Sequence, residues 1–260
     1  MFFGWLRERR REKILAEPFD ERWTEHLTSN MGAWASLSGE EQAHLKQLVQ
    51  VFVAEKHWEG LAGLELNDEV RVTIAGQACL LVLELPHDLY RRVESILVYP
   101  TTVNAPPPSG SFFHTSAEVA DQGMPISGQA FKRGPVILVW DAVKRGGRNA
   151  HDGHNVVFHE FAHKLDMLSG DADGVPPLHD KETYRRWIEV FQREWDALHE
   201  RQDRGRRTFL DAYAGTNPAE FFAVATEQFF EQGRTMQRKH QELYDVLRGF
   251  YRQDPASRRD

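Results

Sequence analysis

Two histidines and a glutamate lie close together near the middle of the chain. Residues 156–163 read VVFHEFAH, so the pattern His-Glu-x-x-His occurs inside an apolar stretch. In an α-helix, His159 and His163 share one face, where both imidazoles can reach a single zinc ion at about 2.0–2.1 Å. Glu160 is one step around the helix, beside the water that the metal would hold, which is the place of a general base. The pattern predicts a zinc-dependent hydrolytic site.

The surrounding residues favour a helix through this pattern. Asp152 or Asn155 can cap its N-terminus, and apolar residues recur with helical spacing through Leu168 before Gly170. A chance His-Glu-x-x-His is expected in on the order of a few percent of chains with this many histidines. Because the pattern also falls on a predicted helix, as its chemistry requires, chance is the weaker interpretation.

Two histidines do not complete a catalytic zinc site, which needs a third protein ligand and an open fourth position. The extended pattern His-Glu-x-x-His-x-x-Gly-x-x-His is not met, because Asp166 stands at the glycine position and Ser169 at the last histidine position. Asp171 and Asp173 follow on a loop without fixed geometry, which makes them weak candidates. A ligand from a more distant segment is therefore favoured.

A helix start further along the chain offers a better third ligand. Asn217 is a suitable N-cap, Pro218 fits the first helical position and Glu220 falls at the third. A rigid helix start presents a carboxylate better than a loop does. Glutamate at this position also serves in a capping box, and the residues alone leave the two roles equally open. Glu227, further along the same face, is a candidate to orient a histidine ligand, although a solvent-facing glutamate is the commoner case.

The composition is that of a globular protein with a sizeable core. The chain has 260 residues, of which 41% are hydrophobic, and we expect one compact domain over 1–260. Within it, 1–150 would hold N-terminal helices and a sheet, and 151–260 the metal-binding helices. The net charge of −7 and the pI near 6.0 disfavour direct nucleic-acid binding, because phosphate contacts need clustered cations.

Cys79 is the one cysteine of the chain, which excludes an internal disulfide and a cysteine-ligated zinc site. Any metal must therefore be held by histidines and carboxylates. This usage fits a reducing compartment, and we expect a cytoplasmic protein. No apolar run approaches the ~18 residues of a membrane span. Residues 1–13 predict a short basic helix whose aromatic side chains pack on the body of the protein rather than on a membrane.

The residue patterns outside the motif predict an α+β fold, rich in helices, with a small mixed sheet beside the His-Glu-x-x-His helix. These elements would position the site. Alternating apolar residues predict a strand over 70–74, and apolar runs predict strands over 95–99 and 135–140. The last of these precedes the histidine motif. It would lie either along the metal cleft, where its edge could bind an extended peptide, or in the core of the sheet.

Further helices and loops follow from capping and periodicity. A capping box formed by Ser38 and Glu41 opens one predicted helix. Helices are expected over 38–53, 76–85 and 184–198, the second being favoured over a strand by its length and composition. A proline-rich loop is expected over 104–110, including Pro106–Pro108, and a flexible turn over 146–149.

The residues around both candidate ligands resemble a known family. The segment 159–166, HEFAHKLD, is followed by Tyr213 and by 217–223, NPAEFFA. Together these closely resemble the Mlc titration factor A family of bacterial zinc metallopeptidases, which are of the zincin type. The resemblance covers nearly the whole chain, including 96–100 and the predicted strand at 136–140.

The resemblance implies a set of roles. The zinc ligands would be His159, His163 and Glu220, with one zinc ion per chain, and Glu160 would be the catalytic base. The spacing from Tyr213 to Glu220 is similar to that in the catalytic domain of anthrax lethal factor, where such a tyrosine assists the reaction. Tyr213 is therefore expected to donate a hydrogen bond to the developing oxyanion.

The resemblance also implies a function. Family members show aminopeptidase activity on small or apolar N-terminal residues, and they bind the glucose repressor Mlc. We therefore expect a zinc metallopeptidase with a peptide substrate and an Mlc-type transcriptional repressor as partner. The alternative is a regulator that sequesters the repressor without catalysis, its zinc being structural. No acidic residue stands out in the sequence as the group that would bind the substrate's free amine.

Overall fold

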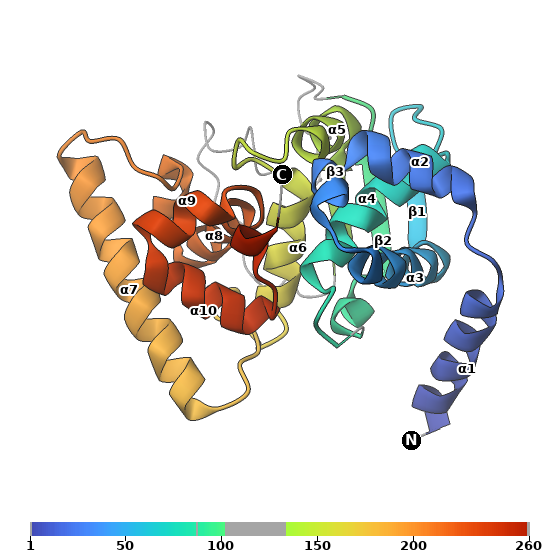
Figure 1. Cartoon of the computed structure of the whole chain (residues 1–260), viewed down its shortest axis with the longest axis horizontal. Coiled ribbons are helices and arrows are strands. Elements are labelled where there is room, and N and C mark those ends of the chain that lie inside the picture. Colours follow the sequence, from blue (N-terminus) through green and yellow to red (C-terminus); the bar gives the residue numbers. More distant parts are fainter. Residues whose placement is uncertain (1, 87, 102–133, 259–260) are drawn as a thin grey trace.

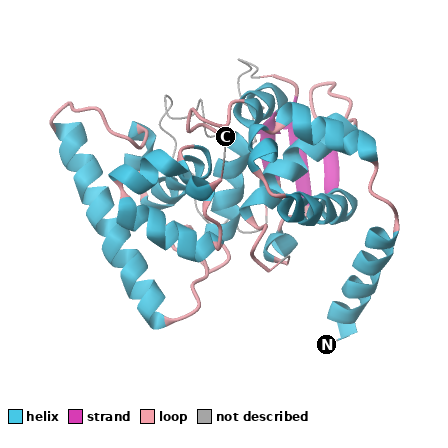
Figure 2. Cartoon of the chain, in the orientation of Figure 1, coloured by secondary structure: helices cyan, strands magenta, loops and turns pink. Residues whose placement is uncertain are grey.

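Helices dominate the architecture. The computed structural model describes residues 2–86, 88–101 and 134–258 (Figure 1). The α-helices of these segments are α1 (Phe2–Ala16), α2 (Glu21–Asn30), α3 (Gly39–Glu55), α4 (Asp68–Leu81), α5 (Trp140–Arg148), α6 (Val156–Asp166), α7 (Lys181–Asp203), α8 (Pro218–Glu231), α9 (Gly233–Lys239) and α10 (Gln241–Tyr251). The strands are β1 (His57–Gly60), β2 (Ser95–Tyr99) and β3 (Val136–Val139). The expected α+β class, rich in helices, is confirmed (Figure 2).

The sheet has the order β1-β2-β3, and both strand pairs are parallel. The strands predicted over 95–99 and 135–140 are confirmed, although β3 stops at Val139 because Trp140 begins α5. The described strands are all parallel, so the expectation of a mixed sheet is wrong for them. The connection between β1 and β2 includes α4, and such a crossover allows two successive strands to lie parallel. Among the described strands, β3 pairs with β2 alone and so lies at an edge.

The strand predicted over 70–74 is wrong, because these residues belong to α4. Asn67 caps this helix, its side chain accepting a hydrogen bond from the backbone N–H of Val70 at 3.1 Å. Residues 72–81 are all buried. A helix that is covered on every side needs apolar residues on every face, so alternation of apolar residues does not distinguish it from a strand.

The predicted helices are largely confirmed. The capping box at the start of α3 is complete, because Ser38 Oγ accepts from the N–H of Glu41 and the Glu41 carboxylate accepts from the N–H of Ser38. The helix expected over 76–85 is confirmed as far as the end of α4, and 184–198 lies within α7. The loop expected over 104–110 lies outside the described residues.

The flexible turn predicted over 146–149 is wrong as far as Arg148, where α5 ends, and Gly146 and Gly147 lie inside this helix. Both glycines are buried at close contacts with other segments. A Cβ on Gly147 would lie 2.3 Å from the carbonyl oxygen of Asn30, and one on Gly146 would lie 2.9 Å from that of His154. Here the glycines allow α5 to pack closely rather than breaking the helix.

The helix predicted over 1–13 is confirmed and continues to Ala16 as α1, which lies at one end of the molecule (Figure 1). Arg11 ties it to Glu55 of α3 through an ion pair of 2.7 Å. The expectation that its aromatic residues pack on the body is wrong for Trp5, whose exposure is 49%. No helix in the described segments is both long and apolar enough to span a membrane.

Helix α6 lies between the N-terminal and C-terminal parts of the fold (Figure 1). It packs against α4 and β3 on one side and against α8 on the other. Phe161 of α6 is in ring contact with Phe52 and Tyr90, at centroid distances of 5.8 and 4.9 Å. This packing anchors α6 firmly, and the segment that carries the histidines is therefore part of the core.

Candidate metal centre

The predicted helix does carry the two histidines on one face. Asn155 is its cap, because its Oδ1 accepts from the backbone N–H groups of Val157 and Phe158, each at 3.1 Å. Asp152, the other candidate cap, instead accepts from the N–H of His154. The cap fixes where α6 begins.

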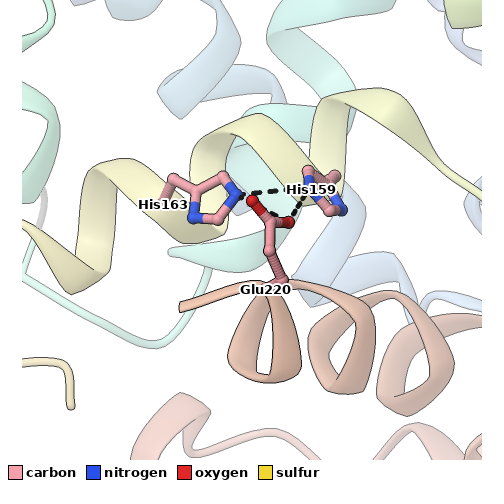
Figure 3. Close-up of side chains that lie close together, drawn as sticks. All are labelled: His159, His163 and Glu220. Carbon is pink, nitrogen blue, oxygen red and sulfur yellow. Dashed lines mark hydrogen bonds and ion pairs between the residues drawn. The ribbon is translucent and has the colours of Figure 1, made fainter. Parts of the chain in front are cut away.

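The first turn of α8 presents Glu220 to α6. Asn217 Oδ1 accepts from the backbone N–H of Glu220 at 3.0 Å, and Pro218 occupies the first helical position. This cap uses the backbone of Glu220, and its carboxylate points toward the two imidazoles (Figure 3). In α3, by contrast, the glutamate side chain completes the capping box. The geometry thus favours a ligand role for Glu220 over a capping role.

Three possible ligand atoms converge between the two helices (Figure 3). Glu220 Oε2 lies 3.0 Å from His159 Nε2 and 3.4 Å from His163 Nε2, and the two nitrogens are 3.2 Å apart. A tetrahedral zinc site with bonds of about 2.0–2.2 Å has ligand atoms about 3.3–3.6 Å apart. The observed triangle therefore has nearly the size of one face of a zinc coordination shell.

The donor set also fits a cation chemically. Glu220 Oε2 is buried and lacks an aligned hydrogen-bond donor. Two imidazole nitrogens that face one another repel when both carry lone pairs, and a cation between them removes that repulsion. In the segments that the structure describes, His159, His163 and Glu220 form the one group of three or more His, Cys, Asp or Glu side chains able to hold a metal ion.

Glu227 is buried and contacts His159 from behind, which is the less common of the two alternatives that the sequence left open. Its Oε1 lies 2.8 Å from His159 Nδ1, and its Oε2 accepts from the backbone N–H of Asn155 at 2.6 Å. The contact favours a proton on Nδ1 and leaves the Nε2 lone pair directed at the centre. Glu227 therefore fixes both the imidazole and the start of its helix.

Charges at the centre are strongly coupled. Burial alone would raise the pKa of Glu220, but the imidazoles of His159 and His163 outweigh it and hold that pKa well below its usual range. Burial alone would lower the pKa of His159, but Glu220 and Glu227 outweigh it and raise that pKa well above its usual value. The carboxylates thus favour positive charge where the three ligand atoms meet, which a metal ion can supply in place of a proton.

Glu160 and Tyr213 lie at the same centre. Glu160 follows His159 on α6, is half-buried, and is close enough to interact electrostatically with Tyr213. Tyr213 lies in a 3-10 turn, Ala212–Gly215, just before α8, with its ring centroid 6.1 Å from that of His159. Burial and the Glu220 carboxylate raise the pKa of the Tyr213 hydroxyl, so it keeps its proton and can act as a donor.

The nearby aspartates take no part in this group. Asp171 and Asp173 are exposed, and Asp173 accepts from the N–H of Val175 in a turn. Asp166, which interrupts the extended histidine pattern, is fully buried and accepts from the N–H of Gly174 at 2.9 Å. Burial raises the pKa of Asp166 to about 6.

Sequence reasoning missed one further buried carboxyl group. Glu231 Oε2 accepts from the N–H of Gly153 at 2.9 Å. Burial, together with the carboxylates of Asp152 and Glu227, raises the pKa of Glu231 to about 9, so it is uncharged near pH 7. The signal was present in the sequence, because Glu220, Glu227 and Glu231 recur at helical spacing on one face.

Known proteins resemble this chain over most of its length. A family model described as glucose-regulated metallo-peptidase M90 matches residues 5–252. An uncharacterized protein from Synechocystis sp. is 37% identical over 255 residues, covering 96% of this chain and 90% of that protein. Mlc titration factor A from Salmonella arizonae is 33% identical over 230 residues, covering 86% of this chain and 88% of the relative. The same protein from an Enterobacter species is 33% identical over 243 residues, with coverage of 91% and 87%.

These matches confirm the resemblance drawn from the motifs. The family is one of metallopeptidases, so a metal site is expected in its members, and the group of two histidines and a glutamate is suited to zinc. This chain belongs to the glucose-regulated metallopeptidase M90 family.

Proposed function

We propose that this protein is a zinc-dependent peptidase in which His159, His163 and Glu220 hold the metal. The observation that supports the proposal is the triangle formed by their three ligand atoms. A catalytic zinc site has three protein ligands and one open position, whereas a structural site is usually closed by four. The group has three members within the described segments, which supports a catalytic site.

Each residue of the centre has a role in peptide hydrolysis. Zinc, when bound, supplies a Lewis acid that lowers the pKa of water to about 7 and polarises a carbonyl. Glu160 accepts the proton of the attacking water and delivers it to the leaving amine. Tyr213 donates a hydrogen bond to the developing oxyanion, a contact worth about 3 kcal/mol. Glu227 keeps the imidazole of His159 in the orientation that the site requires.

The substrate proposed here is a peptide with a free, small or apolar N-terminal residue. The support is the resemblance to the Mlc titration factor A family, together with the identity of about a third to relatives of that name. The test is a panel of aminoacyl nitroanilides with their N-acetylated counterparts, assayed after removal of metal by a chelator and again after zinc is returned. We expect zinc-dependent cleavage of the free forms alone. Equal cleavage of the acetylated forms would exclude an aminopeptidase.

Replacement of Glu160 separates catalysis from metal binding. Glu160→Gln keeps the size of the side chain and removes the base, so the rate should fall by about 10²–10⁴-fold while bound zinc is retained. Glu65→Gln, at an exposed position, is a control that should leave the rate unchanged. A Glu160→Gln protein that cleaves at the wild-type rate would remove Glu160 from its proposed role.

A second role is regulatory, namely binding of an Mlc-type repressor. The observation that favours it is the name Mlc titration factor A borne by relatives that cover most of this chain. Titration of a purified Mlc-type repressor should show equal binding by the wild type and by Glu160→Gln. Absence of binding by both would remove the regulatory role and leave the peptidase proposal intact.

A further inference from the structure

Gly174, in the segment between α6 and α7, forms hydrogen bonds through both its N–H and its carbonyl oxygen. The N–H of Gly174 donates to Asp166 Oδ2 at 2.9 Å, and its carbonyl oxygen accepts from Trp187 Nε1 at 3.0 Å. Asp166 is the last residue of α6, and Trp187 lies on α7; both are almost completely buried. These two hydrogen bonds fix the backbone of Gly174 to the end of one helix and to the side of another.

Gly174 also touches the first turn of α8. A Cβ on Gly174 would lie 2.4 Å from the carbonyl oxygen of Pro218 and 2.9 Å from its carbonyl carbon. The φ angle of Gly174 is +78°, in the left-handed region. Only a hydrogen atom fits between the two backbones. Pro218 stands two residues before Glu220, so this contact limits how closely the start of α8 approaches the end of α6.

We propose that Gly174, held by Asp166 and Trp187, is a positioning residue that sets the distance between Glu220 and the imidazoles of α6. The inference rests on the proposed function, since it concerns the same zinc site. It also gives Asp166 a role. Asp166, which interrupts the extended histidine pattern, anchors the segment that contains Gly174. The start of α8, which carries Glu220, packs against this segment.

The size of the expected displacement supports this role. Restoring an ordinary contact between a methyl carbon and a carbonyl oxygen from the clash distance needs a shift of about 1 Å. Metal–ligand distances tolerate changes of only about 0.2 Å. If α8 yields, Glu220 Oε2 leaves its place 3.0 Å from His159 Nε2. If the segment that contains Gly174 moves instead of α8, its hydrogen bonds to Asp166 and Trp187 must break.

The test compares alanine substitutions at two glycines that both have a left-handed backbone conformation. Gly174→Ala meets the backbone of Pro218. Gly63→Ala is the matched control, because Gly63 has a φ of +82° and no atom near the position of an added Cβ. Zinc affinity is measured on metal-free protein by competition with a chromophoric chelator, and thermal unfolding is recorded for the metal-free forms. The visible spectrum of the cobalt-substituted proteins reports the coordination geometry.

Gly174→Ala should weaken zinc binding by about 10–100-fold and alter the cobalt spectrum. Gly63→Ala should keep the wild-type affinity and spectrum, even where its unfolding temperature falls. Equal zinc affinity in Gly174→Ala and wild type would overturn the inference while leaving the zinc site in place. If the wild type itself binds no zinc, the proposed function fails and the positioning role fails with it.

A second pair of variants decides the matter if Gly174→Ala does not fold. Asp166→Ala removes the acceptor for the N–H of Gly174, whereas Asp166→Asn keeps an oxygen in its place. Zinc affinity should fall in Asp166→Ala and be retained in Asp166→Asn. The same affinity in both variants would contradict the proposed anchoring of Gly174.

Discussion

The first and last glutamates of helix α8, the partly buried Glu220 and the buried Glu231, differ in charge state. At the first turn, the imidazoles of His159 and His163 overcome the effect of burial and hold the pKa of Glu220 well below its usual range. At the last turn, burial raises the pKa of Glu231 to about 9, and its Oε2 accepts from the N–H of Gly153. The residue type and the helix are the same. The difference indicates that the charge of the facing groups decides whether a glutamate of this helix is ionised, as a metal ligand must be, or is a neutral hydrogen-bonding group.

The comparison predicts that the two glutamates respond very differently to removal. Glu220→Ala deletes a proposed ligand and should weaken zinc binding by more than the roughly 100-fold loss typical of residues behind the ligands. The measurement is zinc affinity by chelator competition, supported by metal analysis of the purified protein. Undiminished zinc stoichiometry at the wild-type affinity would remove Glu220 from the proposed set of ligands.

Glu227 lies between these two glutamates and should give an intermediate effect. Glu227→Gln removes the charge that faces His159 Nδ1, which is 2.8 Å from Glu227 Oε1. We expect zinc affinity to fall by about 10–100-fold. Circular dichroism serves as a control that the fold is kept. An affinity equal to that of the wild type would mean that the Glu227 charge does not support the histidine.

Acidification should weaken zinc binding through His159. In the metal-free protein, Glu220 and Glu227 outweigh burial and raise the pKa of His159 well above its usual value, so zinc must displace a proton near pH 7. Apparent affinity should therefore rise by about tenfold for each pH unit between pH 6 and 7. A zinc affinity that does not change over this range would show that no such proton is displaced.

Glu231→Gln should have the smallest effect on zinc, because Glu231 is already uncharged near pH 7. Its effect should appear in stability. A carboxyl whose pKa is raised by folding binds its proton more tightly in the folded state, so folding weakens as pH rises from the unfolded pKa toward about 9. The variant should lose this pH dependence, which amounts to at most about 1.4 kcal/mol per pH unit. Urea unfolding at pH 6 and pH 8 measures this dependence. If the free energy of unfolding changes equally between the two pH values in variant and wild type, the pKa of Glu231 is not raised.

Local sequence rules predicted the two helices that carry the candidate site. The histidine pattern lies on a capped helix, and Asn217 and Pro218 begin the helix that carries Glu220. Capping and helical spacing act over a few residues, so they can be read from the chain directly. The pairing of α6 with α8 is a long-range contact, and residue patterns alone left the role of Glu220 open. The resemblance to a family supplied the expectation that the structure's geometry supports.

Two of the errors in the predicted fold share one physical cause. Residues 70–74 alternate like a strand, yet they lie in α4, which is buried on almost every face. Gly146 and Gly147 read as a turn, yet they lie in α5, where other backbone segments approach them closely. In both places tertiary packing outweighed the local preference. The role inferred for Gly174 depends on the same kind of close contact, which the sequence did not indicate.

The proposed zinc ligands can be identified directly in a crystal of protein loaded with one equivalent of the ion, using anomalous scattering at the zinc absorption edge. We expect a single zinc ion bonded to Nε2 of His159, Nε2 of His163 and a carboxylate oxygen of Glu220, at about 2.0–2.2 Å. Glu160 should lie near the ion without bonding to it. Zinc bound by other side chains, or a fourth protein ligand that closes the site, would exclude the proposed catalytic centre.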